Sequence, residues 1–195
     1  MKPYPVLLVH GIDDNHTRLS RISAALLAHG FAPVSAMDII PPDGSISIES
    51  MGEQVLNAVH QLQQTAHSPK VDIVAYSMGA LAVRHFLQRQ GGQALVRRFI
   101  SIAGPHHGTL TAYMRHGKAI RQMRPGSDLI RDLNNDRAPW GNVEVFSFWT
   151  PLDLTIIPAT SALLRGARNR SFFVPVHPLM VYDRRVITAV QQTLA

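Results

Sequence analysis

Short apolar runs alternate with segments of helical period along most of this chain. Apolar runs of strand length cover residues 5–11, 31–39, 70–76, 96–104, 143–150 and 171–177, as expected of strands buried on both faces. Apolar residues recur at helical spacing over residues 17–30, 47–67, 78–92 and 180–194. This alternation predicts an α/β fold: a mostly parallel sheet of about six strands with helices on both faces.

The pattern has one long interruption, residues 105–142, between the fourth and fifth apolar runs. A chain of 195 residues suits one well-packed domain, so we expect residues 1–195 to form a single unit. In open parallel sheets the ligand site lies beyond the carboxyl ends of the strands. The residues that follow each apolar run, and the start of the 105–142 insertion, are therefore the candidates for chemistry.

The stretch VDIVAYSMGA, residues 71–80, places a serine where a buried strand gives way to a helix. A sharp strand–turn–helix of this kind exposes the serine hydroxyl as a nucleophile, and the backbone segments come so close that nearby side chains must be small. Ala75 and Gly79, two positions on either side of Ser77, meet that demand. A serine that merely caps the helix would not need small neighbours on both sides.

An acid and a base follow later strands in the chain order serine, acid, histidine, which accompanies a serine on a strand–turn–helix of this kind. Asp153 follows the fifth apolar run, and His177 ends the sixth. A histidine can take and return a proton near neutral pH, and the acid holds it in the required tautomer. The alternatives are a solvated loop histidine for His177 and a helix N-cap for Asp153, which a catalytic role would not exclude.

Backbone N–H groups are the expected partners of the negative charge that develops in acyl transfer. Met78 directly follows the serine, and Ile12 lies in the loop after the first strand; the N–H groups of these two residues are the predicted oxyanion donors. His106 and His107 follow the fourth strand, out of order for the base, and are candidates for a site wall that contacts substrate or for a loop anchor.

The composition narrows the remaining possibilities. Hydrophobic residues make up 46% and charged residues 16%, as in a globular domain. The net charge is +6, but the basic residues are interleaved with apolar residues rather than clustered, so we expect no nucleic-acid partner. With no cysteine, thiol chemistry and disulfides are excluded, and no metal site or cofactor is indicated. The N-terminal residues do not read as a secretory signal, which predicts a cytoplasmic location but leaves secretion open.

Taken together, the motifs VHGID, VDIVAYSMGA, WTPLDLTIIP and VPVHPLM resemble those of the small bacterial lipases and esterases of the α/β-hydrolase superfamily. The chain is similar in particular to the minimal, lidless Bacillus lipases. The resemblance implies a minimal α/β-hydrolase fold and a serine carboxylic-ester hydrolase that works through an acyl-enzyme. It assigns Ser77, Asp153 and His177 as the triad and Ile12 and Met78 as oxyanion donors.

The sequence differs from that family in two places, and it is also compatible with two other functions. The loop GIDDN has Asp13 and Asp14 where the family often has Gly-Gly, and the 105–142 insertion is longer. An acyltransferase would use the same triad with an alcohol or amine in place of water. A binding domain without catalysis could retain the same fold.

Residues 108–126 bear on access to the site. Apolar residues there alternate with basic ones: Leu110, Tyr113, Met114, Ile120 and Met123 with Arg115, Lys118, Arg121 and Arg124. This pattern fits a surface that touches lipid, with Tyr113 and Met114 contacting substrate. It also fits an ordinary amphipathic helix whose apolar side packs on the sheet. The expected partner is a small-molecule or lipid ester, and the oligomeric state is not indicated.

Overall fold

A computed structural model describes residues 4–195 and shows one sheet in which every neighbouring pair of strands is parallel. The strand order is β2-β1-β3-β4-β5-β6. The strands are β1 (Val6–Val9), β2 (Val34–Met37), β3 (Val71–Tyr76), β4 (Val96–Ile102), β5 (Glu144–Trp149) and β6 (Arg168–Ser171). The predicted parallel α/β sheet is therefore confirmed.

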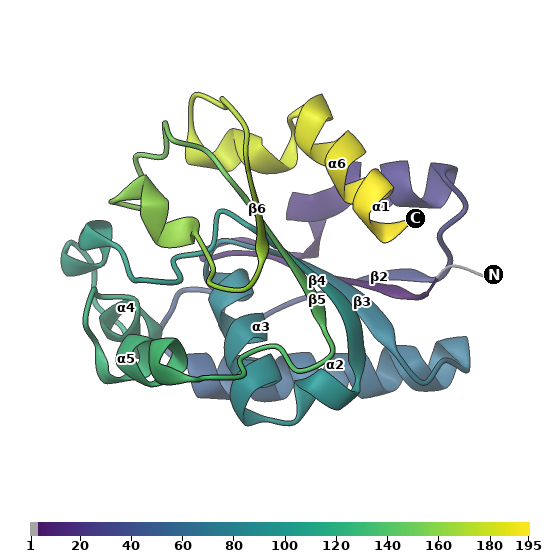
Figure 1. Ribbon diagram of the computed structural model, residues 1–195, viewed down its shortest axis with the longest axis horizontal. Coiled ribbons are helices and arrows are strands. Elements are labelled where there is room, and N and C mark those ends of the chain that lie inside the picture. Colours follow the sequence, from purple (N-terminus) through teal and green to yellow (C-terminus); the bar gives the residue numbers. More distant parts are fainter. Residues whose placement is uncertain (1–3) are drawn as a thin grey trace.

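Helices cover both faces of this sheet (Figure 1). One face carries α1 (Ser20–Ala28) and α6 (Arg184–Leu194); the other carries α2 (Ile48–Ala66) and α3 (Met78–Arg89). Successive strand residues point to opposite faces. In β1, Val6 and Leu8 accordingly pack in the cluster under α1 and α6, whereas Leu7 and Val9 pack in the cluster under α2 and α3. Burial on both faces explains why β1 is an unbroken apolar run.

The predicted position of the sixth strand was wrong. The apolar run at 171–177 predicts a strand there, but β6 consists of the exposed residues Arg168–Ser171. Backbone pairing of β6 with β5 ends with the Phe172 N–H, which donates to the carbonyl oxygen of Trp149. Phe172 and Val174 are buried all the same, because the chain folds over the sheet after leaving it. As an edge strand, β6 needs only one row of backbone partners, so its side chains are free to be polar.

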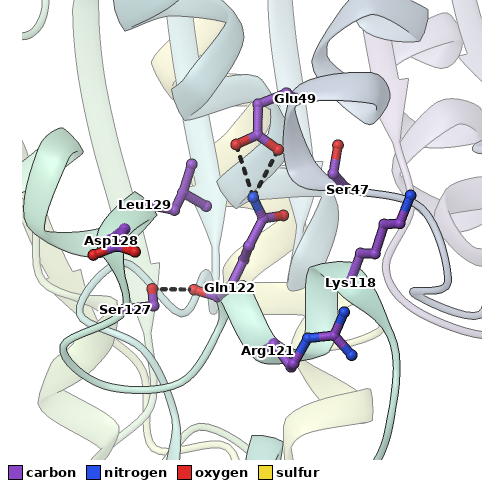
Figure 2. Close-up of a pocket in the computed structure, with 8 residues that line it drawn as sticks. All are labelled: Ser47, Glu49, Lys118, Arg121, Gln122, Ser127, Asp128 and Leu129. Carbon is purple, nitrogen blue, oxygen red and sulfur yellow. Dashed lines mark hydrogen bonds between the residues drawn. The ribbon is translucent and has the colours of Figure 1, made fainter.

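The 105–142 insertion carries its own short helices: a 3₁₀ turn (Leu110–Tyr113), α4 (Lys118–Gln122) and α5 (Asp128–Asn135). Figure 2 shows how the insertion is attached to the first turn of α2: the side-chain amide of Gln122 donates to both carboxylate oxygens of Glu49, at 2.7 Å each. The Gln122 side-chain oxygen in turn accepts from the Ile48 N–H at 2.7 Å. The insertion is thereby fixed to the main body of the domain. Among residues 4–195, no helix combines the length and the hydropathy needed to cross a membrane.

Candidate active site

Ser77 occupies a strained turn between β3 and α3. Its φ of 54° and ψ of −126° lie outside the regions that ordinary residues prefer. A Cβ atom on Gly79 would lie 2.1 Å from the carbonyl oxygen of His10, which no side chain could tolerate. Ala75 is fully buried in the neighbouring strand. The small residues around the serine therefore follow from the close approach of β1, β3 and α3.

Ser77, His177 and Asp153 form one continuous chain of hydrogen bonds. His177 Nε2 lies 2.9 Å from Ser77 Oγ, and His177 Nδ1 lies 2.7 Å from Asp153 Oδ2. The other carboxylate oxygen of Asp153 accepts from the N–H groups of Thr155 and Ile156, each at 2.9 Å. With both oxygens of Asp153 in use as acceptors, the Nδ1 of His177 carries the proton and Nε2 is free to accept one from the serine.

All three side chains are nearly enclosed, with exposed fractions of 5–6%. The ring of Tyr76, on the residue before the serine, lies against the His177 ring with centroids 5.0 Å apart. Burial raises the pKa of Tyr76, so its hydroxyl stays protonated there. Tyr76 therefore supports the imidazole as a neutral aromatic neighbour.

The N–H groups of Ile12 and Met78 donate no hydrogen bond to any group within residues 4–195. Both residues line the same cleft as Ser77. His10 holds the loop that contains Ile12: His10 Nδ1–H donates to the Gly11 carbonyl at 2.7 Å, and Nε2 accepts from the Ile39 N–H at 2.8 Å. This pair of bonds requires the neutral imidazole. Two free N–H groups beside the serine are what an oxyanion site requires.

The cleft at Ser77 has a volume of 310 Å³ and is mainly apolar. The insertion supplies one wall and the segment after Asp153 another; the lining residues are Ile12, Ser77, Met78, Thr109, Thr111, Ala112, Met114, Arg115, Ile120, Met123, Thr155 and Ile156. The hydroxyls of Thr109 and Thr111 both donate to the Thr155 carbonyl, which ties the two walls together. The sequence pattern did not single out Thr155 or Ile156 for this role; their only signal was their place next to Asp153.

His106 and His107 do not reach this cleft, although the sequence made them candidates for substrate contact. His106 is fully buried, and its Nε2 lies 2.7 Å from Ser101 Oγ. Burial, together with the nearby Arg84 guanidinium, lowers the pKa of His106 well below its ordinary value. His107 lines a separate cavity with Trp140, and its Nδ1 contacts the Asn134 side-chain amide. Both histidines anchor the loop after β4 instead.

Some residues of segment 108–126 are buried, as in a helix packed against the domain, and others are exposed, as in a surface that touches lipid. Ile120 and Met123 are buried, at 2% and 6% exposure, and form the inner wall of the cleft. Tyr113 and Met114 are exposed at 57% and 83%. Met114 borders the cleft, whereas Tyr113 lies outside it with its ring under the Arg124 guanidinium. The segment is therefore part cleft wall and part exposed apolar surface.

A parallel doubly wound sheet with a serine on the turn after its central strand, linked to a histidine and an aspartate from later loops, defines an α/β-hydrolase. Residues 5–136 match the palmitoyl protein thioesterase family. The chain belongs to this family. Asp153 and His177 lie beyond the matched residues, so their assignment depends on the geometry above.

The chain is also similar to a curated relative, the triacylglycerol lipase of Pseudomonas fragi, with 28% identity over 111 residues. That match covers 54% of this chain and only 36% of the lipase. The solved mature lipase BlEst2 of Bacillus licheniformis superposes with a TM-score of 0.85 at 15% identity, covering 100% of this chain and 93% of that one. Lipase B of Aspergillus fumigatus superposes with a TM-score of 0.82 at 20% identity, covering 98% and 52%. At these identities the structural likeness concerns the fold.

Among residues 4–195, no three histidine, aspartate or glutamate side chains gather in a way that could hold a metal ion. The groups around Ser77 are those of acid–base and nucleophilic chemistry.

Proposed function

We propose that this protein is a serine hydrolase that cleaves carboxylic esters through an acyl-enzyme intermediate. The observation that carries the proposal is the hydrogen-bond chain from Ser77 through His177 to Asp153, next to two unpartnered backbone N–H groups. The membership in a thioesterase family and the similarity to a triacylglycerol lipase support hydrolysis of an acyl group bonded to sulfur or oxygen.

The geometry gives each group a role in the two half-reactions. His177 Nε2 takes the proton of Ser77 Oγ as the oxygen bonds to the substrate carbonyl carbon, and the carbonyl oxygen becomes an oxyanion beside the Ile12 and Met78 N–H groups. The oxyanion then collapses, the bond to the leaving alcohol breaks, and that alcohol receives the proton from His177. A water molecule, deprotonated by the same nitrogen, attacks the acyl-enzyme, and the acid leaves as Ser77 regains its proton.

The apolar cleft supports the proposal that the acyl group is a hydrocarbon chain. Its inner wall consists of Ile120, Met123 and Ile156, and no formal charge lies on that wall. Arg115, at the mouth, is the one charged residue that borders the cleft within the described chain. An apolar acyl chain would therefore be removed from water on binding.

Two measurements test the ester-hydrolase proposal. Hydrolysis of p-nitrophenyl esters of increasing acyl length should be detectable and should be lost in Ser77→Ala, while an organophosphonate should label the wild type and leave Ser77→Ala unmodified. Absence of both turnover and labelling would point to a binding domain on the same fold. Product analysis in the presence of a competing alcohol separates hydrolysis from acyl transfer.

We further propose that the substrate is reached at a lipid surface. Exposed apolar side chains occur on three of the loops near the triad: Leu110, Tyr113 and Met114 after β4, Leu152 and Leu154 around Asp153, and Phe173, Val176 and Leu179 around His177. Their exposed fractions range from 41% to 83%. Clusters of exposed apolar residues around a site mouth are typical of surfaces that meet lipid or another apolar partner.

Polar substitutions at the rim test this second proposal. In Tyr113→Ser combined with Met114→Ser, activity on long-chain emulsified esters should fall more than activity on short soluble ones. Leu27→Ser is the matched control, because Leu27 is also exposed, at 53%, but lies in the last turn of α1 and does not line the cleft. Equal losses on both substrates, or the same selective loss in the control, would contradict the lipid-surface proposal.

A further inference from the structure

We propose that the ion pair between Asp13 and Arg115 is a latch that keeps the Ile12 N–H aligned for the oxyanion. The proposal rests on the ester-hydrolase function above. It makes Asp13 and Arg115 positioning residues, which act through the Ile12 backbone and do not themselves touch the reacting atoms.

Asp13 can influence the orientation of the Ile12 N–H because it directly follows Ile12 in the chain. Its φ of 55° lies in the left-handed region, which asparagine and aspartate tolerate better than most residues. The Asp13 N–H donates to the Pro42 carbonyl at 2.9 Å, and its carboxylate lies 2.7 Å from an Arg115 guanidinium nitrogen. Asp13, the residue directly after Ile12, is thus held both through its backbone N–H and through its side-chain carboxylate.

Arg115 belongs to a wall that does not depend on this pair for its own position. Two residues on, Gly117 packs so tightly against the Gly44 carbonyl that a Cβ atom there would lie 2.4 Å from its oxygen. The Ala119 N–H donates to that same carbonyl at 3.1 Å, and α4 is held to α2 by the Gln122–Glu49 bonds (Figure 2). The latch therefore connects a loop that carries an unpartnered N–H to a fixed part of the insertion.

The latch also accounts for the charged residue that borders an otherwise apolar cleft. Ile12 and Arg115 both line the cleft at Ser77, and the hydrogen bond that Arg115 donates to the Asp13 carboxylate raises the pKa of Arg115. Arg115 is therefore charged at any pH where the enzyme could work. Its charge is directed to the oxyanion loop, and the Asp13 carboxylate is correspondingly held away from the developing oxyanion.

The expected effect is modest because both side chains are about half exposed, at 46% and 52%, and water weakens such a pair. Removing it should lower kcat about two- to fivefold. Loss of an oxyanion donor itself would cost about 10²–10³-fold. Since the latch does not hold the acyl chain, KM should stay nearly unchanged.

Four single variants separate the latch from a merely structural role. Asp13→Asn keeps the shape and the tolerance of left-handed backbone but removes the charge; Arg115→Gln removes the opposite charge, and Arg115→Lys restores it. Arg121→Gln is the matched control, since Arg121 lies on the same segment and forms no ion pair within residues 4–195. The measurements are kcat and KM on a short soluble ester, and amide hydrogen exchange of residues 11–14 in the resting protein.

We expect Asp13→Asn and Arg115→Gln to lower kcat and to speed exchange at residues 11–14, with Arg115→Lys and Arg121→Gln close to wild type. Raising the salt concentration to about 1 M, where the Debye length is about 3 Å, should reproduce both effects in the wild type and in the two variants that keep the pair, Arg115→Lys and Arg121→Gln. The two charge-removing variants should not respond. Unchanged exchange in the two charge-removing variants would overturn the latch. Exchange needs no substrate, so a wild type that cleaves no ester would refute the proposed function while the latch is still decided by exchange.

Discussion

The carboxylate of Asp153 offers the sharpest test of the site, through its replacement with the isosteric amide in Asp153→Asn. In the native site one oxygen accepts from His177 Nδ1 and the other accepts from two backbone N–H groups, those of Thr155 and Ile156. An amide has only one oxygen, so it can replace the carboxylate at one of these places but not at both.

The two orientations of the amide differ in energy, and this difference decides which nitrogen of His177 carries the proton. If the NH₂ group faced Thr155 and Ile156, donors would face donors in a buried place, at a cost of about 1–3 kcal/mol for each unsatisfied group. If the oxygen stays with the two N–H groups, the NH₂ group faces His177 and needs an acceptor there. His177 then carries its proton on Nε2, which faces Ser77 and can no longer accept the serine proton.

We therefore expect kcat to fall about 10⁴-fold, the order found when the carboxylate of such a triad becomes an amide, which corresponds to about 5.5 kcal/mol of barrier. The melting temperature should change little, because volume and shape are kept. The assay is the kcat for a short p-nitrophenyl ester beside a thermal melt, with Asp132→Asn as control; Asp132 is exposed and pairs with Arg89, outside the cleft. A variant that retains a tenth or more of the wild-type kcat would refute this tautomer argument.

Three further predictions concern stability and specificity. Burial keeps His106 neutral in the folded protein, whereas the unfolded chain binds a proton below about pH 6.5. Stability should therefore fall as the pH falls below that value, by up to about 1.4 kcal/mol per pH unit for this group, and melts of His106→Gln should show a shallower slope; an unchanged slope would contradict the assignment. Gly79→Ala, whose Cβ would meet the His10 carbonyl, should displace the serine turn and lower kcat about 10²-fold; wild-type kinetics would contradict that contact. Ile120→Ala should shift the p-nitrophenyl ester preference toward longer acyl chains while destabilising the fold by about 2–5 kcal/mol; an unchanged chain-length profile would exclude Ile120 from the acyl wall.

Local pattern was sufficient for most of the architecture. Strands buried on both faces are mainly apolar, so β1, β3, β4 and β5 are visible as short, mostly apolar runs, and their alternation with helices predicts the parallel sheet. The serine turn is visible for the same kind of reason, since the close approach of backbone segments restricts Gly79, two residues after the serine, and Ala75 on the other side is fully buried. The chain order of strands then predicts where Asp153 and His177 come together.

Features that depend on distant partners were invisible in the sequence. β6 is defined by backbone pairing along one edge, and its residues need no apolar signature. His106 looked like a site residue because it follows a strand, but packing encloses it against Ser101. The walls of the cleft are formed by Thr109, Met123 and Ile156, which come together only when the insertion folds against the loop that carries Asp153.

The sequence by itself thus determined the fold and the identity of the reacting groups, because both are restricted by short-range geometry. Only the tertiary structure decided the shape of the cleft, the exposed apolar rim and the partner of Asp13. The cleft, part of the rim and the partner of Asp13 depend on how the 105–142 insertion packs, and that packing is a sum of many weak contacts between residues far apart in the chain. Arg115 and Asp13 are 102 residues apart in sequence, yet their side chains lie 2.7 Å from each other.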